Sequence, residues 1–269
     1  MFKHKLSKAF FTQTRFMKNH LFVLLFILFA TSCSNWNGHQ TGASLSAALR
    51  AKKMNGLTFV APPRPFDDDP MIDIRDVGAD WIAVVPYAFT RPEEAKVHFN
   101  HERQWWGERR EGCQKTIQMA HEAGLNVLLK PQVWVRRSWV GDLDYDTENE
   151  WQQWETDYEA YILMLVELAE EEGVKLFCIG TEFKRSERKR EQFWRSLIAK
   201  IRERYSGKLV YAANWDSYQN VPFWDALDYV GVNAYFPLSP EENPSVRALK
   251  KAWRPHKKEI AAFQQKVQK

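Results

Sequence analysis

An acidic side chain closes an apolar stretch in the middle of this 269-residue chain. The run VKLFCIGTEF, residues 174–183, is apolar on both faces, as in strands buried inside a parallel sheet, yet it ends on the ionisable Glu182. A carboxyl group at such a place is a surface group, a structural group or a catalytic one. A positioned carboxyl can give and take protons, so its chemistry would be general acid-base catalysis.

Two later apolar runs also end in polar or aromatic side chains. LVYAANWD ends in Asn214, Trp215 and Asp216, and DYVGVNAYFP carries Asn233 and Tyr235 near its end. If the three runs are adjacent strands, their ends form a polar cleft with aromatic walls. The alternative reading of Glu182 is a salt-bridged carboxylate on the rim of the fold.

The elements that must position these side chains are alternating strands and helices. The apolar patterns predict strands over residues 56–61, 81–87, 126–133, 174–182, 209–214 and 229–235, and helices over 109–123, 149–171, 188–205 and 245–267. Successive βα units predict a parallel sheet with outer helices. A doubly wound sheet is the alternative, but no G-x-G-x-x-G follows the first strand, so a dinucleotide site is unsupported. We therefore favour an α/β fold of the (β/α) barrel type.

Active sites of such barrels lie at the carboxyl ends of the strands, which would turn Glu182 into the mouth of the site. Strand alternation predicts that Leu176, Cys178, Gly180 and Glu182 share one side, with Gly180 clearing space beneath the acid. The same rule gathers the ends of the two following strands beside it.

Together these motifs resemble one enzyme family. The order KPQVWV, SWVG, IGTEF, AANWD and DYVGVNAYFPL, within residues 54–269, resembles glycoside hydrolase family 113, a (β/α)₈ family of clan A that contains retaining β-1,4-mannanases. The resemblance implies that Glu182 is the general acid/base, although the wider clan usually has Asn where this chain has Thr181. It also implies that the sugar subsites are lined by Gln132, Trp134, Trp139, Asn214, Trp215, Asn233 and Tyr235. For Trp134 and Trp139, ordinary packing under a loop is the alternative.

A retaining hydrolase needs a second carboxyl group, about 5–5.5 Å from the first. The resemblance places this nucleophile, a Glu, at the end of strand seven, whereas the sequence predicts about six of eight βα units. We therefore expect a partial barrel, truncated before strand seven. Glu241 and Glu242 follow the sixth strand, but loop acids beside prolines are expected to be solvated. The resemblance implies an enzyme acting on β-mannan or a related polysaccharide or oligosaccharide, without a cofactor; the alternative is a non-catalytic sugar-binding surface lipoprotein or an inactive gene fragment.

No metal site is predicted. Asp142, Asp144 and Asp146 have the spacing that begins a calcium loop, but the loop's required Gly and final Glu are absent. Thr147 and Glu150 instead have the spacing of a capping box that opens the following helix.

The N-terminal region predicts export and lipid attachment. Residues 21–30 are an apolar run of signal-peptide length after a basic segment, and the ATSC that ends at Cys33 resembles a bacterial lipobox. We expect residues 1–32 to be a lipoprotein signal peptide, Cys33 to be lipidated, residues 33–53 to be a tether, and Met17 to be the true start. The predicted location is the envelope of a Gram-negative bacterium, on the periplasmic side or in the outer membrane, anchored through the lipid.

The basic isoelectric point belongs mostly to this predicted signal. Five of the 38 basic residues and none of the 34 acidic residues lie in residues 1–32, so the remainder carries 33 basic and 34 acidic residues. No nucleic-acid partner is predicted, and the basic run over residues 184–190 is expected to be a solvated helix face. Cys113 and Cys178 are expected to be free thiols, and the protein a monomer.

Overall fold

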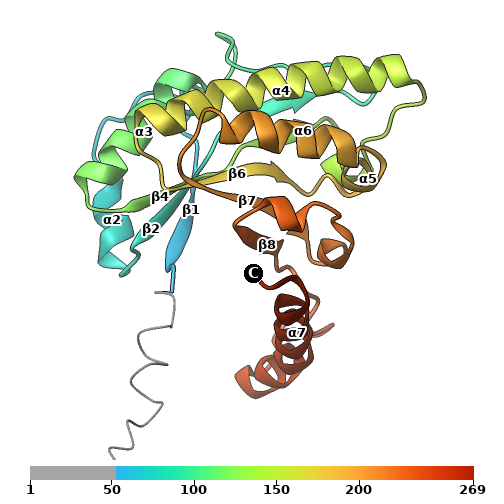
Figure 1. Ribbon diagram of the computed structural model, residues 1–269. Helices are drawn as coiled ribbons and strands as arrows, with labels where there is room; N and C mark the ends of the chain where they lie inside the picture. The colour runs from blue at the N-terminus through green and yellow to red at the C-terminus, as the bar shows by residue number, and fades with distance from the viewer. Residues whose placement is uncertain (1–52) are drawn as a thin grey trace, which may run out of the picture. The chain divides into compact units, whose positions relative to one another are not determined.

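Six parallel strands form the main sheet of this computed structural model, which describes residues 53–269 (Figure 1). They are β1 (Gly56–Val60), β2 (Trp81–Val85), β4 (Asn126–Leu129), β6 (Leu176–Thr181), β7 (Lys208–Asn214) and β8 (Tyr229–Asn233). Each strand pairs in parallel with the next one in this order. The order lacks the reversal of a doubly wound sheet, so the predicted α/β fold of an incomplete barrel is confirmed.

Helices follow the strands as expected. They are α2 (Met71–Asp76), α3 (Arg110–Glu122), α4 (Glu148–Glu171), α5 (Lys184–Lys189), α6 (Glu191–Arg202) and α7 (Val246–Val267). The short α2 was not predicted, and the helix expected over residues 188–205 is divided at Arg190 into α5 and α6. Within residues 53–269, none of the helices combines the length and the apolar character that a bilayer crossing requires.

The layer between the sheet and its helices is rich in aromatic rings. Trp154 of α4 stacks on Tyr158 with ring centroids 4.8 Å apart, and Trp194 of α6 stacks on Phe223 at 5.6 Å. Trp154 and Trp194 are fully buried. The chain contains 12 tryptophans, and packing explains part of this content, because large rings fill the gap between a twisted sheet and its helices.

Two prolines divide predicted strands in two. Pro86 separates β2 from β3 (Tyr87–Thr90), and Pro131 separates β4 from β5 (Gln132–Val135). Proline has no N–H group to donate to a ladder, so the main sheet ends there. The continuations pair with each other as a parallel two-stranded sheet. β3 continues the direction of β2, and β5 that of β4, beyond the carboxyl edge of the main sheet.

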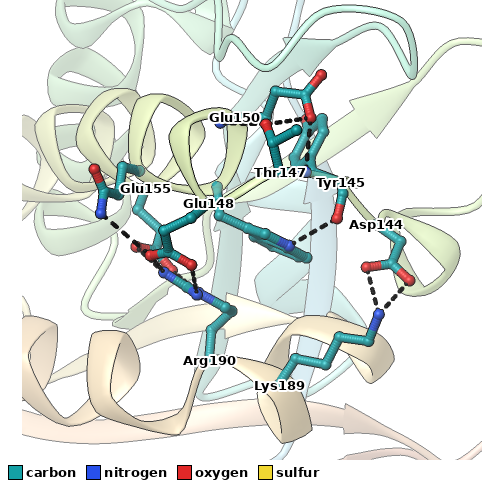
Figure 2. A network of polar contacts seen from close by, with 10 residues as sticks. Asp144, Tyr145, Thr147, Glu148, Glu150, Glu155, Lys189 and Arg190 are labelled. Carbon is teal, nitrogen blue, oxygen red and sulfur yellow. Dashed lines mark hydrogen bonds and ion pairs between the residues drawn. The ribbon is translucent and has the colours of Figure 1, made fainter.

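The start of α4 is fixed by the predicted capping box (Figure 2). The N–H of Glu150 donates to Thr147 Oγ1 at 3.3 Å, and the N–H of Thr147 donates to Glu150 Oε2 at 3.0 Å. The N–H groups of Glu150 and Thr147 have no partner within the helix, and the capping box gives each of them an acceptor. The helix begins at Glu148, one residue before the predicted start.

The basic run is mostly exposed, as predicted, and ion pairs connect it to acidic residues in α4 and in the segment before it. Figure 2 shows Arg190 between Glu148 and Glu155, with its Nε 2.5 Å from Glu155 Oε1. Lys189 Nζ lies 2.6 Å from Asp144 Oδ2. The acidic partners come from distant segments of the chain, so the charge pattern of the run does not show these ion pairs.

On its other side the sheet carries a small separate cluster, which is composed of Leu176, Cys178, Val210 and Ala212. Both cysteines in the described part of the chain, Cys113 and Cys178, are buried free thiols, as predicted. The predicted signal peptide, Cys33 and nearly all of the predicted tether lie outside the described residues.

Candidate active site

Glu182 directly follows the last residue of β6 and has left-handed backbone geometry, with φ of 60°. Its own N–H donates to the carbonyl oxygen of Ala212 at 2.9 Å, which continues the ladder from β7. A residue with a Cβ rarely adopts positive φ, and such strain is concentrated at functional sites. The conformation places the half-buried carboxylate at the carboxyl edge of the sheet.

Two side chains hold the two oxygens of this carboxylate. The indole Nε1–H of Trp139 donates to Glu182 Oε2 at 2.9 Å, and Asn233 Nδ2 donates to Glu182 Oε1 at 2.9 Å. Lys130 Nζ in turn donates to Asn233 Oδ1 at 3.0 Å, which orients the amide. Trp139, Asn233 and Lys130 come from three separate segments, so the fold positions a carboxyl group that can exchange protons with a bound molecule.

The predicted role of Gly180 is wrong. A Cβ on Gly180 would lie 2.9 Å from the ring of Trp194 and 3.0 Å from that of Tyr211, both on the helix side of the sheet. The register of β6 against β7 shifts between Cys178 and Thr181, which breaks the simple alternation of sides. Gly180 therefore makes room for the outer aromatic layer and not for the acid.

Thr181 is buried, and it replaces the Asn that the wider clan usually has before the acid. Its Oγ1 donates to the carbonyl oxygen of Pro131 at 3.4 Å and lies 3.8 Å from Cys178 Sγ. The hydroxyl thus ties β6 to the break between β4 and β5.

A charged chain of contacts runs along the end of β7. Asn214 Nδ2 donates to Asp216 Oδ1 at 3.0 Å, and Asp216 Oδ2 lies 2.6 Å from Lys184 Nζ. Lys184 Nζ lies 6.0 Å from the centroid of Trp139, so this chain reaches the indole that holds Glu182. Trp215 instead faces Phe236, with centroids 5.8 Å apart.

Tyr87 lies near the site, although the sequence did not suggest it. Partial burial raises the pKa of its hydroxyl, and the charges of Glu108, Tyr235 and Glu182 raise that pKa further. Tyr87 begins β3 and lies in register with Gln132 of β5, at the carboxyl edge of the main sheet. Tyr235 is 78% exposed and presents its ring to solvent.

A pocket of about 830 Å³ opens beside Tyr87, over β3 and β5. Its walls include Trp134, which stacks on Phe89 with centroids 5.2 Å apart, and Trp105. Both tryptophans are about half exposed. Burial raises the pKa of Glu108, the carboxyl group in this pocket.

The structure thus divides the predicted residues into three groups. Trp139 and Asn233 contact Glu182; Gln132 and Trp134 lie on β5, with Gln132 in register with Tyr87. Asn214, Trp215 and Tyr235 follow or end the neighbouring strands without a hydrogen bond to Glu182 in the described part of the chain.

Lys130 and Tyr87 were missed, and the signal that found Glu182 could have found them. Lys130 follows the last residue of β4, and Tyr87 lies two residues after the end of β2. Both positions are strand ends at the same edge of the sheet as Glu182. Glu241 and Glu242 are exposed in the loop between β8 and α7.

Comparison with protein families gives a match over most of the chain. The model of glycoside hydrolase family 113 matches residues 67–269. A GH113 β-1,4-mannanase structure has a TM-score of 0.67 at 24% identity, over 79% of this chain. The GH113 β-mannanase AaManA from Alicyclobacillus acidocaldarius, in complex with ManMIm, has a TM-score of 0.61 at 24% identity, over 75% of this chain. A further GH113 β-1,4-mannanase complex has a TM-score of 0.57 at 27% identity, over 68% of this chain.

These structures are longer than the matched region. The matches cover 68%, 67% and 59% of those three chains, respectively. The comparison with curated proteins gives no match.

Proposed function

Because this chain belongs to glycoside hydrolase family 113, we propose that it acts on β-1,4-linked mannan or a related glycan, with Glu182 as the general acid/base of a retaining mechanism. The observation that carries the proposal is the environment of Glu182. This carboxylate is held through both oxygens by Trp139 and Asn233, at the edge where barrel enzymes place their chemistry.

In the proposed reaction the carboxyl group of Glu182 donates its proton to the glycosidic oxygen as the bond to the sugar breaks. The resulting carboxylate then takes a proton from the water that attacks the glycosyl-enzyme intermediate. Trp139 and Asn233 would keep the group in one orientation through both steps, because each holds one of its oxygens. Holding a catalytic group in place removes orientational freedom that would otherwise raise the barrier.

The pocket over β3 and β5 supports binding of a sugar chain. Trp134 and Trp105 expose flat apolar faces, and pyranose rings stack on such faces. Tyr87 lines this pocket and, like Glu182, lies at the carboxyl edge of the main sheet. We propose that the glycan extends from Glu182 past Tyr87 toward Trp134.

The nucleophile stays a prediction. No carboxylate of residues 53–269 has a hydrogen bond to Glu182, and the family resemblance assigns the nucleophile to a seventh strand, whereas the main sheet described has six. A second candidate function, a sugar-binding protein without turnover, is supported by the exposed ring faces of Trp134 and Trp105 beside the pocket. Binding and hydrolysis therefore have to be measured separately.

The test compares Glu182→Gln with the wild-type chain on β-1,4-mannan and on an aryl mannoside that has a good leaving group. Loss of the proton donor should lower mannan hydrolysis by about 10²-fold or more, with a smaller loss on the aryl substrate. Glu167→Gln, at an exposed position of α4, is the matched control and should behave as wild type.

Equal hydrolysis of mannan by wild type and Glu182→Gln would contradict the assigned role. Binding of manno-oligosaccharides without turnover in every variant would support the sugar-binding candidate. A protein that shows no binding of manno-oligosaccharides and no turnover would contradict both candidate functions.

We further propose that Cys33 is lipidated and anchors the protein to a membrane. We also propose that the protein is a monomer. Each buried acyl CH₂ group contributes about 0.8 kcal/mol to membrane binding. A fatty-acid probe supplied to growing cells should label the wild type and not Cys33→Ala. Equal labelling of the two would contradict the lipobox reading.

A further inference from the structure

Glu187 is a fully buried carboxyl group that the proposed reaction does not use. It belongs to α5, five residues after Glu182, inside a run of charged residues. Its Oε2 accepts a hydrogen bond from the hydroxyl of Tyr211 at 2.8 Å, while its Oε1 has no hydrogen-bond partner among the described residues. Burial raises the pKa of this group, whereas the neighbouring Tyr211 and Ser217 hydroxyls lower it. A buried acid with so few partners destabilises the fold, so its presence calls for an explanation.

Tyr211 connects this acid to the backbone next to Glu182. The backbone N–H of Phe183 donates to the Tyr211 hydroxyl oxygen at 2.8 Å. The Tyr211 hydroxyl oxygen accepts this bond, and the hydroxyl donates its own proton to Glu187 Oε2. Glu187 thus fixes the rotation of the hydroxyl, and the hydroxyl fixes the Phe183 peptide.

The two peptides that flank the Cα of Glu182 are both held from β7. The N–H of Glu182 donates to the Ala212 carbonyl at 2.9 Å, and the N–H of Phe183 donates to the Tyr211 hydroxyl. These two peptide planes define φ and ψ of Glu182. A left-handed conformation is unfavourable for a residue with a Cβ, so it persists only when its surroundings impose it.

We propose that Glu187 and Tyr211 are positioning residues that hold Glu182 in its left-handed conformation, and thereby bring its carboxylate to Trp139 and Asn233. This inference rests on the proposed function only for its consequence in catalysis. Neither residue touches the substrate, because both are fully buried on the helix side of the sheet. Their effect passes through the backbone.

The indole N–H of Trp139 reports on the carboxylate without any need for activity. In the full chain labelled with ¹⁵N-tryptophan, its NMR resonance can be assigned by its loss in Trp139→Phe. Its displacement in Glu182→Gln calibrates the loss of the normal contact with the carboxylate. Tyr211→Phe deletes one hydroxyl group and should displace this resonance in the same direction.

Tyr205→Phe is the matched control. It also deletes one hydroxyl from a buried tyrosine, which donates to the Val174 carbonyl at 2.7 Å, near the opposite end of β6. The Trp139 resonance should stay in its wild-type position in this control. An unmoved resonance in Tyr211→Phe, or equal displacement in both variants, would overturn the proposal.

Glu187 itself is tested by two substitutions. Glu187→Gln keeps an oxygen that can accept from Tyr211 and should leave the Trp139 resonance near its wild-type position. Glu187→Ala removes the acceptor and should displace it as Tyr211→Phe does. If Glu187→Ala fails to fold, the comparison of Glu187→Gln with Tyr211→Phe still decides, because equal displacement in those two would overturn the role of the acceptor.

In a chain that turns over mannan, Tyr211→Phe should lower kcat by up to about 10²-fold with little change in KM, because positioning acts on the reacting group. If no variant hydrolyses mannan, the proposed function fails while the NMR comparison still tests the positioning. If kcat is unchanged in Tyr211→Phe while Glu182→Gln is impaired, the positioning proposal fails alone.

Discussion

The two faces of the main sheet differ in how they are filled. The helix-covered face is closed by an interlocked aromatic layer that includes Trp154, Tyr158, Trp194 and Tyr211, all fully buried. The opposite face carries a small cluster around Leu176 and Cys178, against which Trp81 and Leu128 are only partly buried. β1 and β8 each pair with one neighbour in the described sheet.

The difference separates the main source of stability from the place of the proposed chemistry. Dense packing on the helix side is where most of the folding free energy should arise, because buried apolar area and close contact increase together. Glu182, Trp139 and Asn233 lie where the thinly filled face ends. Substitutions on the two faces should therefore have effects of different size and kind.

The largest expected effect on stability is that of Trp194→Ala. Its ring packs on Tyr158, Phe183, Tyr211 and Phe223, so its removal should lower the free energy of unfolding by about 3–5 kcal/mol. Leu176→Ala, on the opposite face, should lower it by only about 2 kcal/mol, the low end for such truncations, because fewer neighbours surround it. Urea unfolding followed by circular dichroism measures both, and equal losses would remove the distinction between the faces.

The second prediction concerns the attachment of edge strand β8 to the helix layer. Burial by itself would raise the pKa of Asp228, but bonds from the Leu209 N–H, Arg202 and Lys208 outweigh it and lower the pKa to about 2. Since the unfolded value is near 3.9, the stabilisation is complete above about pH 4 and is lost as the pH falls toward 2.

This contribution amounts to about 2 kcal/mol. Asp228→Asn should therefore be less stable than wild type at pH 6, and the two should converge near pH 2 when urea midpoints are compared. Asp73→Asn, at an exposed position in α2, is the control and should run parallel to wild type. A constant difference for Asp228→Asn from pH 6 to pH 2 would contradict the assignment.

The smallest expected effect is kinetic and concerns the two buried thiols. Burial raises the pKa of Cys113 to about 12 and also raises that of Cys178, so neither should react with a thiol reagent in the closed state. Reaction then requires local opening, which should be easier on the thinly filled face. In a Cys33→Ser background, Cys178 should be labelled about tenfold faster than Cys113, with each rate assigned by a Cys→Ala variant; faster labelling of Cys113 would reverse the comparison.

The sequence predicted the order of the main strands and the longer helices because these elements have a clear apolar period, as in α4 with Trp151, Trp154 and Tyr158. Glu182 could be found for a related reason, since an acid at the end of a buried strand is conspicuous. Pro86 and Pro131 were visible in the sequence, but they were not used to end the two strands.

Other features depend on contacts that no local pattern shows. The shift in β6 that turns Gly180 toward Trp194 arises from pairing with β7 and not from the residues of β6 alone. Glu187 lies in a run with basic residues before and after it, which is typical of a solvated segment, but its side chain is buried and accepts a hydrogen bond from Tyr211. Long-range hydrogen bonds of this kind could not be derived from a charge pattern.

The left-handed backbone of Glu182 has a consequence for how this position evolves. Glycine and asparagine adopt that conformation more readily than glutamate, so replacement by either would relieve strain and remove the carboxylate in one step. With the proposed role of Glu182, selection for a more stable fold and selection for catalysis oppose each other at this single residue. A lineage that ceased to use the site would be free to drift toward the relaxed residue, whereas a retained glutamate would record continued use.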